Sequence, residues 1–424
     1  MVITVQKNEF IAGLRRAAAA IDGKGNFSVS VKLNKNGGLN LILYTAGIFY
    51  ANVVIPCEAK GAEGEISVVL PRDFLNAANA LSKLGDEFIL DFSDHNLKLS
   101  CGQGIITVDY IANGNVAELP AMSKLGVISL NTEGFRKAIN VVKNSIDPAE
   151  KGAVLRWQNC IGLIPVEKGD VKKLMITASC TVGISVTELN VESVQLEGDM
   201  PSLSIPVGAL STIIGSLSGE KCKINIMAKK SSNEGATPSP AALFIADEKA
   251  SYVLMLLTEK YPDRITQSIE GIVPGCKFKA LMSKEEFSNA IRVASFGDSK
   301  KGISLKVVDE GFLRVSSQSS VNYVDVKAIA KGSMEETRLN PFHLERIVNA
   351  YSGDKVAILT NSDTGMAARS PMMSKIILIS GGEEGDSLIM PISDSTSSEA
   401  MAKTEEARKK SEKETADKEA ALEE

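Results

Sequence analysis

The feature that most constrains this chain is a phrase that occurs three times along its 424 residues. The phrase joins an acidic residue, a phenylalanine and an aliphatic residue four positions later. It reads NEFIAGLRRA from Asn8, TEGFRKAINVV from Thr132 and KEEFSNAIRVA from Lys284. In each copy the apolar residues recur at helical spacing, which predicts a helix with one buried face. A phrase that returns at long, similar intervals is typical of a chain built from repeated units.

A second phrase also occurs three times, beginning at Leu70, Ile205 and Leu339. Each copy opens with an aliphatic residue and a nearby proline, which suits the first turn of a helix. After about ten residues of helical pattern comes a glycine 15, 14 and 14 positions from the start, where a left-handed C-cap is expected. Chance alone would not keep that register. The predicted C-cap glycines are Gly85, Gly219 and Gly353.

Polar residues mark the starts of two first-phrase helices. Thr132 precedes Phe135 by three positions, and Ser283 precedes Glu286 by three, which is the spacing of a capping box. Both residue types accept hydrogen bonds from helix N-termini, so Thr132 and Ser283 are the predicted N-caps.

Between the helices apolar and polar residues alternate, as in GLNLILYTAGIFYANVVI, LKLSCGQGIITVDYI and KVAILTN. Period-two spacing interrupted by turn residues predicts antiparallel β-meanders. The expected fold class is therefore α+β, with each repeat running helix, meander, helix, meander. The predicted domains are residues 1–124, 125–272 and 273–393, followed by a charged tail, residues 394–424, that is either disordered or a lone solvated helix.

Composition agrees with a large cytosolic protein of about three domains. The tail holds ten acidic and six basic residues, so it carries most of the net charge of −5 and leaves the body nearly neutral. Six scattered cysteines without a CxxC pair suggest reduced, partly buried thiols. The sequence shows neither a signal-peptide core nor eighteen consecutive apolar residues, so we expect no membrane association and a cytoplasmic location.

No constellation of catalytic or metal-binding residues stands out. The two histidines, His95 in a predicted turn and His343 in a predicted helix, belong to no metal motif, and we expect both to be structural or solvent-facing. The glycines near Gly23 and Gly102 are turn signals rather than a phosphate-binding loop, and no GxSxG motif is present. The sequence therefore predicts a protein that is not an enzyme and that holds no cofactor and no metal.

Basic residues recur on or near the outward faces of the predicted helices. Each alone reads as an ordinary solvated residue, but their return on equivalent helices suggests a surface for an anionic partner. Glu285, Glu286 and Glu345 dilute the pattern in the third repeat, and the helix from Pro206 has no basic residue. The basic residues of this candidate surface are Arg15, Arg16, Lys24, Arg72, Lys83, Arg136, Lys137, Lys143, Arg292, Lys300 and Lys301.

Over about residues 1–393 the chain resembles the bacterial DNA sliding clamp, the beta subunit of DNA polymerase III. The resemblance rests on the order of the three doubled repeats and on three segments: YPDR from Tyr261, GDSKKGISL from Gly297 and MPI from Met390. It implies a ring-shaped, head-to-tail homodimer whose helices line a central hole. The basic residues of the candidate surface would then be the DNA-facing residues that line this hole. With twelve helices spaced about 10 Å apart, that hole would be roughly 28 Å wide, enough for duplex DNA.

The resemblance also implies a function. Such a ring encircles double-stranded DNA without reading its sequence and tethers the replicative DNA polymerase, the clamp loader and other clamp-motif proteins. It would act in the bacterial cytoplasm, or in the host cytoplasm if a phage encodes the protein. The alternatives are a non-catalytic scaffolding protein built from the same repeats and, less favoured, an enzyme with a site between repeats.

Two further surfaces follow from the resemblance alone. For the dimer interface it implies Ile106 and Val108 on one side and Phe296 on the other, although all three also suit the core of their own domains. The second surface is a peptide pocket between the second and third domains, where the alternative is plain interdomain core. Its implied walls are Leu155, Ser179, Val182, Ile184, Pro262, Thr266, Leu388, Ile389, Met390, Pro391 and Ile392.

The pocket segments depart from the family pattern. This chain has SCTVGI from Ser179 where the family commonly has Thr-Asp-Gly-His-Arg-Leu, and RITQ follows YPD in place of a run of arginines. A binding site is still expected there, with a preferred peptide that differs from the common bacterial motif.

Overall fold

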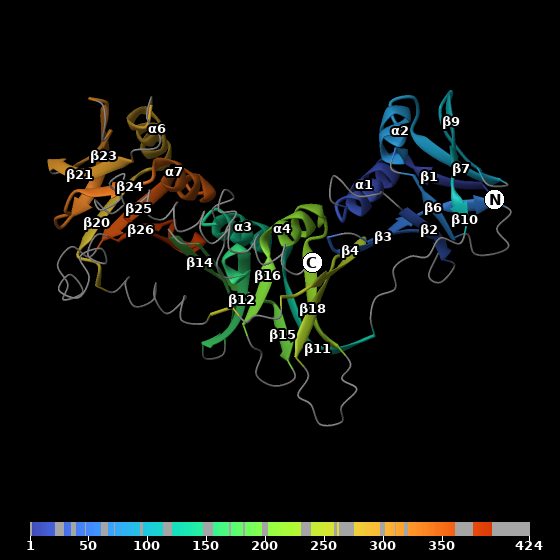
Figure 1. Cartoon of the computed structure of the whole chain (residues 1–424), viewed down its shortest axis with the longest axis horizontal. Coiled ribbons are helices and arrows are strands. Elements are labelled where there is room, and N and C mark those ends of the chain that lie inside the picture. The colour runs from blue at the N-terminus through green and yellow to red at the C-terminus, as the bar shows by residue number, and fades with distance from the viewer. Residues whose placement is uncertain are drawn as a thin grey trace, which may run out of the picture. The chain divides into compact units, whose positions relative to one another are not determined.

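A computed structural model gives the structure of the chain in two compact units, residues 1–179 with 186–265 and residues 180–185 with 266–424 (Figure 1). Each unit is treated by itself below, and the three predicted domain boundaries stay a prediction. The described residues are 2–21, 29–34, 40–46, 48–60, 67–71, 73–93, 96–112, 121–146, 156–168, 171–180, 183–196, 202–229, 239–257, 261–262, 275–296, 302–309, 311–317, 321–360 and 376–391.

The elements follow the predicted repeat order, and the described residues hold six α-helices. The first repeat contains β1 (Val2–Gln6), α1 (Lys7–Ala18), β2 (Val29–Asn34), β3 (Asn40–Ala46), β4 (Tyr50–Pro56), β5 (Glu58–Lys60), β6 (Ser67–Leu70), α2 (Phe74–Leu81), β7 (Glu87–Ser93), β8 (Asn96–Cys101), β9 (Gly104–Asp109) and β10 (Ile111–Ala112). The second contains β11 (Met122–Asn131), α3 (Thr132–Lys143), η1 (Arg156–Asn159), β12 (Cys160–Lys168), β13 (Val171–Cys180), β14 (Gly183–Asn190), β15 (Ser193–Leu196), β16 (Leu203–Pro206), α4 (Val207–Ser216), β17 (Lys221–Lys229), β18 (Pro240–Ala246) and β19 (Ala250–Met255).

The third repeat lies in the second unit. It contains β20 (Phe278–Ser283), α6 (Lys284–Ala294), β21 (Ile303–Asp309), β22 (Phe312–Ser317), β23 (Tyr323–Lys331), β24 (Thr337–Leu339), α7 (Pro341–Ala350), β25 (Lys355–Thr360), β26 (Ile377–Ser380), η4 (Gly382–Glu384) and β27 (Asp386–Ile389). Its strands pair in the order β27-β26-β25-β20-β23-β22-β21-β24. In the first unit, one sheet runs β5-β1-β7-β8-β9 and another runs β10-β6-β2-β3-β4-β19-β18-β17-β11-β15. The pairings described are antiparallel, so the α+β class and the predicted meanders are confirmed.

The predicted helix faces form the core. In α1, Phe10 and Leu14 are fully buried, and the Phe10 ring packs edge-on against Phe74 of α2, 6.2 Å between centroids. Phe10 also contacts Phe88 of β7, with 5.0 Å between the ring centroids, so one phenylalanine joins both helices to the sheet. The phenylalanine of the first phrase is likewise fully buried in the other repeats, as Phe135 in α3 and Phe287 in α6. Burying one such ring stabilises the fold by about 1.5–3 kcal/mol.

One predicted N-cap is correct and one is wrong. The Ser283 hydroxyl accepts from the Glu286 amide at 3.3 Å, as its spacing predicts. At α3 the cap is Asn131, whose side-chain oxygen accepts from the Gly134 amide at 2.8 Å, while Thr132 is the first helical residue. Asparagine caps at least as well as threonine, and here it lies one position earlier.

The predicted left-handed C-cap glycines are wrong. None of Gly85, Gly219 and Gly353 has a positive φ. Gly85 is instead required by a close approach, because a Cβ there would lie 2.6 Å from the backbone nitrogen of Gly102. In the other two repeats a distant carboxylate accepts from the glycine amide, from Asp247 for Gly219 and from Glu384 for Gly353. In these two repeats the carboxylate accepts the hydrogen bonds of the amides that follow the helix, so no residue in the left-handed conformation is needed there.

Candidate DNA-facing helices, pocket residues and strand edges

The helices of the first repeat present basic side chains outward. Arg15 of α1 is exposed and donates to the Asn79 side-chain oxygen of α2 at 3.3 Å. Arg16 is half-buried one position further on, and Lys83 after α2 is exposed. Among the described residues no carboxylate forms an ion pair with these three, so their charge remains available to an anionic partner.

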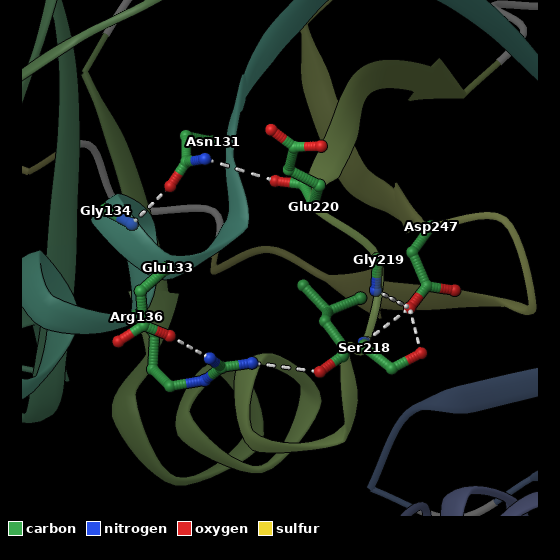
Figure 2. Close-up of polar contacts among 9 residues, drawn as sticks. Asn131, Glu133, Gly134, Arg136, Ser218, Gly219, Glu220 and Asp247 are labelled. Carbon is green, nitrogen blue, oxygen red and sulfur yellow. Dashed lines mark hydrogen bonds and ion pairs between the residues drawn. The ribbon is translucent and has the colours of Figure 1, made fainter.

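In the second repeat, α3 carries two kinds of basic residue. Lys137 is exposed and Lys143 is half-buried in the last turn. Arg136 is already engaged, because it forms an ion pair with Glu133 and donates to the Leu217 carbonyl at 2.9 Å (Figure 2). It therefore ties α3 to the end of α4, and its charge is offset locally.

The third repeat differs. Arg292 of α6 donates from Nε to Glu345 Oε1 of α7 at 2.5 Å. A groove beside this pair is lined by Lys284, Glu285, Asn289, Arg292 and Asp354, among others, so its charge is mixed. The candidates Lys24, Arg72, Lys300 and Lys301 lie outside the described residues.

The predicted pocket residues fall in both units, and each set has its own partners. In the first unit, the Ser179 hydroxyl lies 3.2 Å from the Tyr261 hydroxyl, next to the half-buried Pro262. Tyr261 is fully buried, and its carbonyl accepts from the Ser202 hydroxyl at 2.6 Å. A Cβ at Gly162 would lie 2.6 Å from the Tyr261 ring, which explains the glycine.

In the second unit the predicted residues gather around β27. Leu388, Ile389 and Pro391 are buried, whereas Met390 is half-buried. The Ser387 hydroxyl lies 2.5 Å from that of Ser185, next to the half-buried Ile184. Leu155, Val182, Thr266 and Ile392 lie outside the described residues.

Two residues that contact the predicted pocket segments of the second unit, Tyr351 and His343, were not identified from the sequence as contacts of these segments. The Tyr351 hydroxyl donates to the Ile379 carbonyl at 3.1 Å and lies 2.8 Å from the Ser387 hydroxyl, so it anchors β27 to β26. His343 of α7 is buried, as expected for a structural residue, and a Cβ at Gly183 would lie 2.7 Å from its Nε2. Neither contact has a local signal in the sequence. His95 lies outside the described residues.

The predicted interface residues differ in exposure. Phe296 is 79% exposed at the end of α6. Ile106 and Val108 are only partly buried and pack against the core of their own unit, as the alternative interpretation also expects. Next to Ile106, on the opposite face of β9, Ile105 is 56% exposed, and on β23 Tyr323 is 55% exposed. The strict alternation of GIITVD could have identified Ile105.

The six cysteines all lie in the described part of the chain, and none forms a disulfide with another. Burial raises the pKa of the Cys57 and Cys222 thiols to about 11, so both stay protonated at neutral pH. Within the described ranges no group of three or more His, Cys, Asp or Glu could hold a metal ion. No helix found there is long and apolar enough to cross a membrane.

No protein-family model and no curated protein matches the sequence. Solved structures do match the fold. A Helicobacter pylori beta clamp bound to a DNA ligase peptide is 20% identical at a TM-score of 0.70, covering 93% of this chain and 100% of that one. DNA polymerase III subunit beta of Borrelia burgdorferi is 17% identical at a TM-score of 0.73, with coverages of 93% and 100%. The beta subunit of Streptococcus pyogenes DNA polymerase is 15% identical at 0.73, with coverages of 92% and 100%. The chain therefore has the fold of the bacterial DNA polymerase III beta clamps.

Proposed function

We propose that this chain is a sliding clamp, a non-enzymatic processivity factor that encircles duplex DNA and tethers replication and repair proteins. The observation that carries the proposal is a fold shared over more than nine-tenths of the chain and the whole of each clamp. A similarity that covers every repeat in order supports the proposal that the chain forms the architecture that encirclement needs. Its place of action would be the cytoplasm, where the DNA, the polymerase and the clamp loader meet.

The helix charges support loose contact with DNA. Five basic side chains form no ion pair among the described residues and can therefore contact phosphates. They are Arg15, Arg16, Lys83, Lys137 and Lys143. Contacts to phosphates hold and orient a duplex but do not read its sequence. A ring that slides needs this kind of contact, because base-specific hydrogen bonds would stop it at particular sites.

Partner binding is proposed to involve the predicted pocket residues of each unit, such as Ser179 and Pro262 in the first and Leu388 and Met390 in the second. The Helicobacter pylori clamp, which shares this fold, was solved with a DNA ligase peptide bound. We propose that this chain takes short peptides of polymerases, loaders and repair proteins in the same manner. Its altered segment from Ser179 to Ile184 would give it a different preferred sequence.

Retention on circular DNA tests the proposal. The protein is loaded onto a nicked circle, the circle is separated from unbound protein, and one half of the sample is linearised. A clamp stays on the circle and slides off the linear DNA, because encirclement and not affinity holds it. A scaffolding protein would not be retained on the circle, and retention that linearisation leaves unchanged would contradict the clamp function. Turnover of a substrate would favour the enzyme alternative.

A further inference from the structure

The sheet of the third repeat has one face packed against α6 and a second face that carries apolar and basic side chains. On β20, Phe278, Ala280 and Met282 are buried on the face against which α6 packs. Lys279 and Leu281 alternate with them and lie on the other side, because neighbouring residues of a strand point to opposite faces. This second side is named the open face below.

Three apolar side chains lie together on the open face. Leu281 of β20 is half-buried and lies directly opposite Ile329 of β23, which is 76% exposed. Phe312 of β22 is also exposed and is a diagonal neighbour of Ile329 across the β22–β23 pair. Diagonal neighbours on one face are within reach of an aromatic side chain, so these three residues form an apolar strip.

The other two repeats have a polar pair at the same position. Thr4, Ser129 and Leu281 each lie three residues before the first residue of the first helix in their repeat. Thr4 lies opposite Glu58, and Ser129 lies opposite Ser193. The construction of a repeat therefore does not require an apolar pair here, and the pair in the third repeat is a property of its surface.

Three lysines border the apolar strip. Lys331 lies two residues after Ile329 on β23 and directly opposite Lys279 of β20. Lys327 lies two residues before Ile329 on the same face, and all three lysines are exposed. Like charges directly opposite each other destabilise a sheet, so an anionic occupant would relieve the repulsion between Lys279 and Lys331.

The carboxylates of the described residues leave these lysines without an ion pair. Asp325 of β23 lies on the open face, but it already accepts from Arg314 at 2.7 and 2.9 Å. Asp386 at the start of β27 is half-buried and interacts electrostatically with Lys279 without forming an ion pair. The open face therefore combines an apolar strip with positive charge that these two carboxylates do not neutralise.

The tail of the same chain has the complementary chemistry in its sequence. Residues 394–424 hold ten acidic and six basic residues, and the last fourteen, residues 411–424, hold six acidic and two basic ones. Leu422 is the one large aliphatic residue of that last stretch. Several carboxylates around one aliphatic side chain match lysines around an apolar strip.

The chain leaves the sheet close to the open face. Ile389 of β27 aligns across β26 and β25 with Phe278, the first residue of β20. The chain therefore leaves at the end of the sheet where Lys279 and Lys331 lie, three strand spacings from β20, which is about 14 Å. Residues 392–410 can span up to about 60 Å when extended, so the last fourteen residues can reach the open face.

We propose that residues 411–424 dock on the open face of the third repeat. Their carboxylates lie against the three lysines, and Leu422 lies on the pair formed by Leu281 and Ile329. A tether raises the local concentration of a segment to the millimolar range, so weak contacts are enough to hold it. The docked segment keeps other acidic, apolar peptides off this face until they displace it. The inference does not rest on the proposed clamp function, because the sheet, the lysines and the tail belong to one chain.

Labelling of side chains by hydroxyl radicals tests the contact in the full-length chain. Labelling of Ile329 and Phe312 should rise at least about twofold when the chain ends at Lys410, because the tethered segment is bound for more than half of the time. E412Q/E414Q/D417N/E419Q keeps the length of the tail and should give a similar rise. The exposed Phe342 of α7 is the control and should not change. Unchanged labelling of Ile329 in both variants would overturn the proposal, and protection that grows with protein concentration would assign the contact to the tail of a second copy.

A peptide of residues 411–424, added to the chain that ends at Lys410, tests which residues bind it. I329E and K279E/K331E should each weaken peptide binding at least about fivefold at low salt, because they place negative charge on the open face. I111E, at an exposed position of the first repeat, is the matched control and should leave binding unchanged. Equal binding to I329E and I111E would contradict the placement of the segment. Peptide binding without protection of Ile329 in the full-length chain would overturn the tail as occupant and favour an acidic segment of another protein.

Discussion

The second and third repeats share one plan and differ in where they hold their charges. In both, a carboxylate from a later turn accepts from the two amides that follow the second helix. Asp247 accepts from Ser218 and Gly219 after α4 at 2.7 and 3.3 Å (Figure 2), and Glu384 accepts from Ser352 and Gly353 after α7 at 2.6 and 2.9 Å. The first helices differ, because Lys137 of α3 is exposed, whereas Arg292 of α6 forms an ion pair with Glu345.

The difference shows that a repeat can keep its construction while its outer charge is changed. The carboxylate after the second helix is structural, since an unsatisfied amide is costly wherever the helix lies. The charge on the first helix is not needed for folding, so it varies. Asp247 does more than Glu384, because its second oxygen also accepts from the Lys249 and Ala250 amides at 2.9 and 2.7 Å. It therefore shapes the turn that carries Lys249, whose ammonium forms an ion pair with Glu9 of α1 at 2.8 Å.

The largest expected effect comes from Asp247→Asn. Burial alone would raise the pKa of Asp247, but four backbone N–H groups outweigh it and lower the pKa below its usual value. Removing the charge should cost about 1–3 kcal/mol of local stability. Amide hydrogen exchange around Ser218 and Gly219 should become roughly 5- to 150-fold faster.

The acid dependence of this effect has a definite sign. A carboxyl with a lowered folded-state pKa stabilises the fold above its unfolded-state pKa, and the contribution is lost as the pH falls through the folded-state value. The original chain should therefore approach D247N in exchange rate as the sample is acidified below the ordinary range of aspartate. Glu384→Gln is the matched control in the third repeat and should have a smaller effect on Ser352, since Glu384 holds no second turn. An exchange rate unchanged in D247N would show that Asp247 is not what anchors α4.

A medium effect is expected from reversing the charge of α3. K137E/K143E should lower the affinity for a short duplex at least several-fold at low salt. It should also flatten the dependence of log affinity on log salt by up to about 1.8, which is two phosphate contacts. Fluorescence anisotropy over a salt series measures both. R292E is the control in the third repeat, and its slope should hardly move because Arg292 is already paired. Equal losses of duplex affinity in K137E/K143E and R292E would show that α3 and α6 do not differ in their contribution to DNA binding.

The repeat order and the helix faces could be predicted because they depend on local spacing. Phe10, Phe135 and Phe287 are buried where the first phrase places them. The cap at α3 was misplaced because Asn131 and Thr132 are both good caps and only the backbone decides between them. The glycine conformations were wrong because Asp247 and Glu384 lie about 30 residues beyond the amides that they accept from.

The candidate DNA-facing residues could be predicted as a group, but the sequence did not show which of them form an ion pair with a carboxylate. Arg136 and Arg292 look in the sequence like Lys137, yet each has a carboxylate partner in the structure. For Arg292 that partner is 53 residues away, and only the packing of α6 against α7 brings it close. The exposed Tyr323 was also missed, because apolar residues in a strand suggest burial unless the register of the whole sheet is known.

The smallest expected effect comes from Glu345→Gln, which would make α6 behave more like α3. The change removes the charged partner of Arg292, so its guanidinium becomes available to phosphate. Duplex affinity should rise by less than about threefold, with a salt slope steeper by up to about 0.9. Stability should change by no more than about 1 kcal/mol, since the Arg292 side chain is 59% exposed and the pair is screened by solvent. The control R292Q/E345Q should bring affinity and slope back to their original values, because no charge is then released. A rise in affinity that persists in this double variant would mean that the lost negative charge of Glu345 acts on DNA directly, and that Arg292 does not face the duplex.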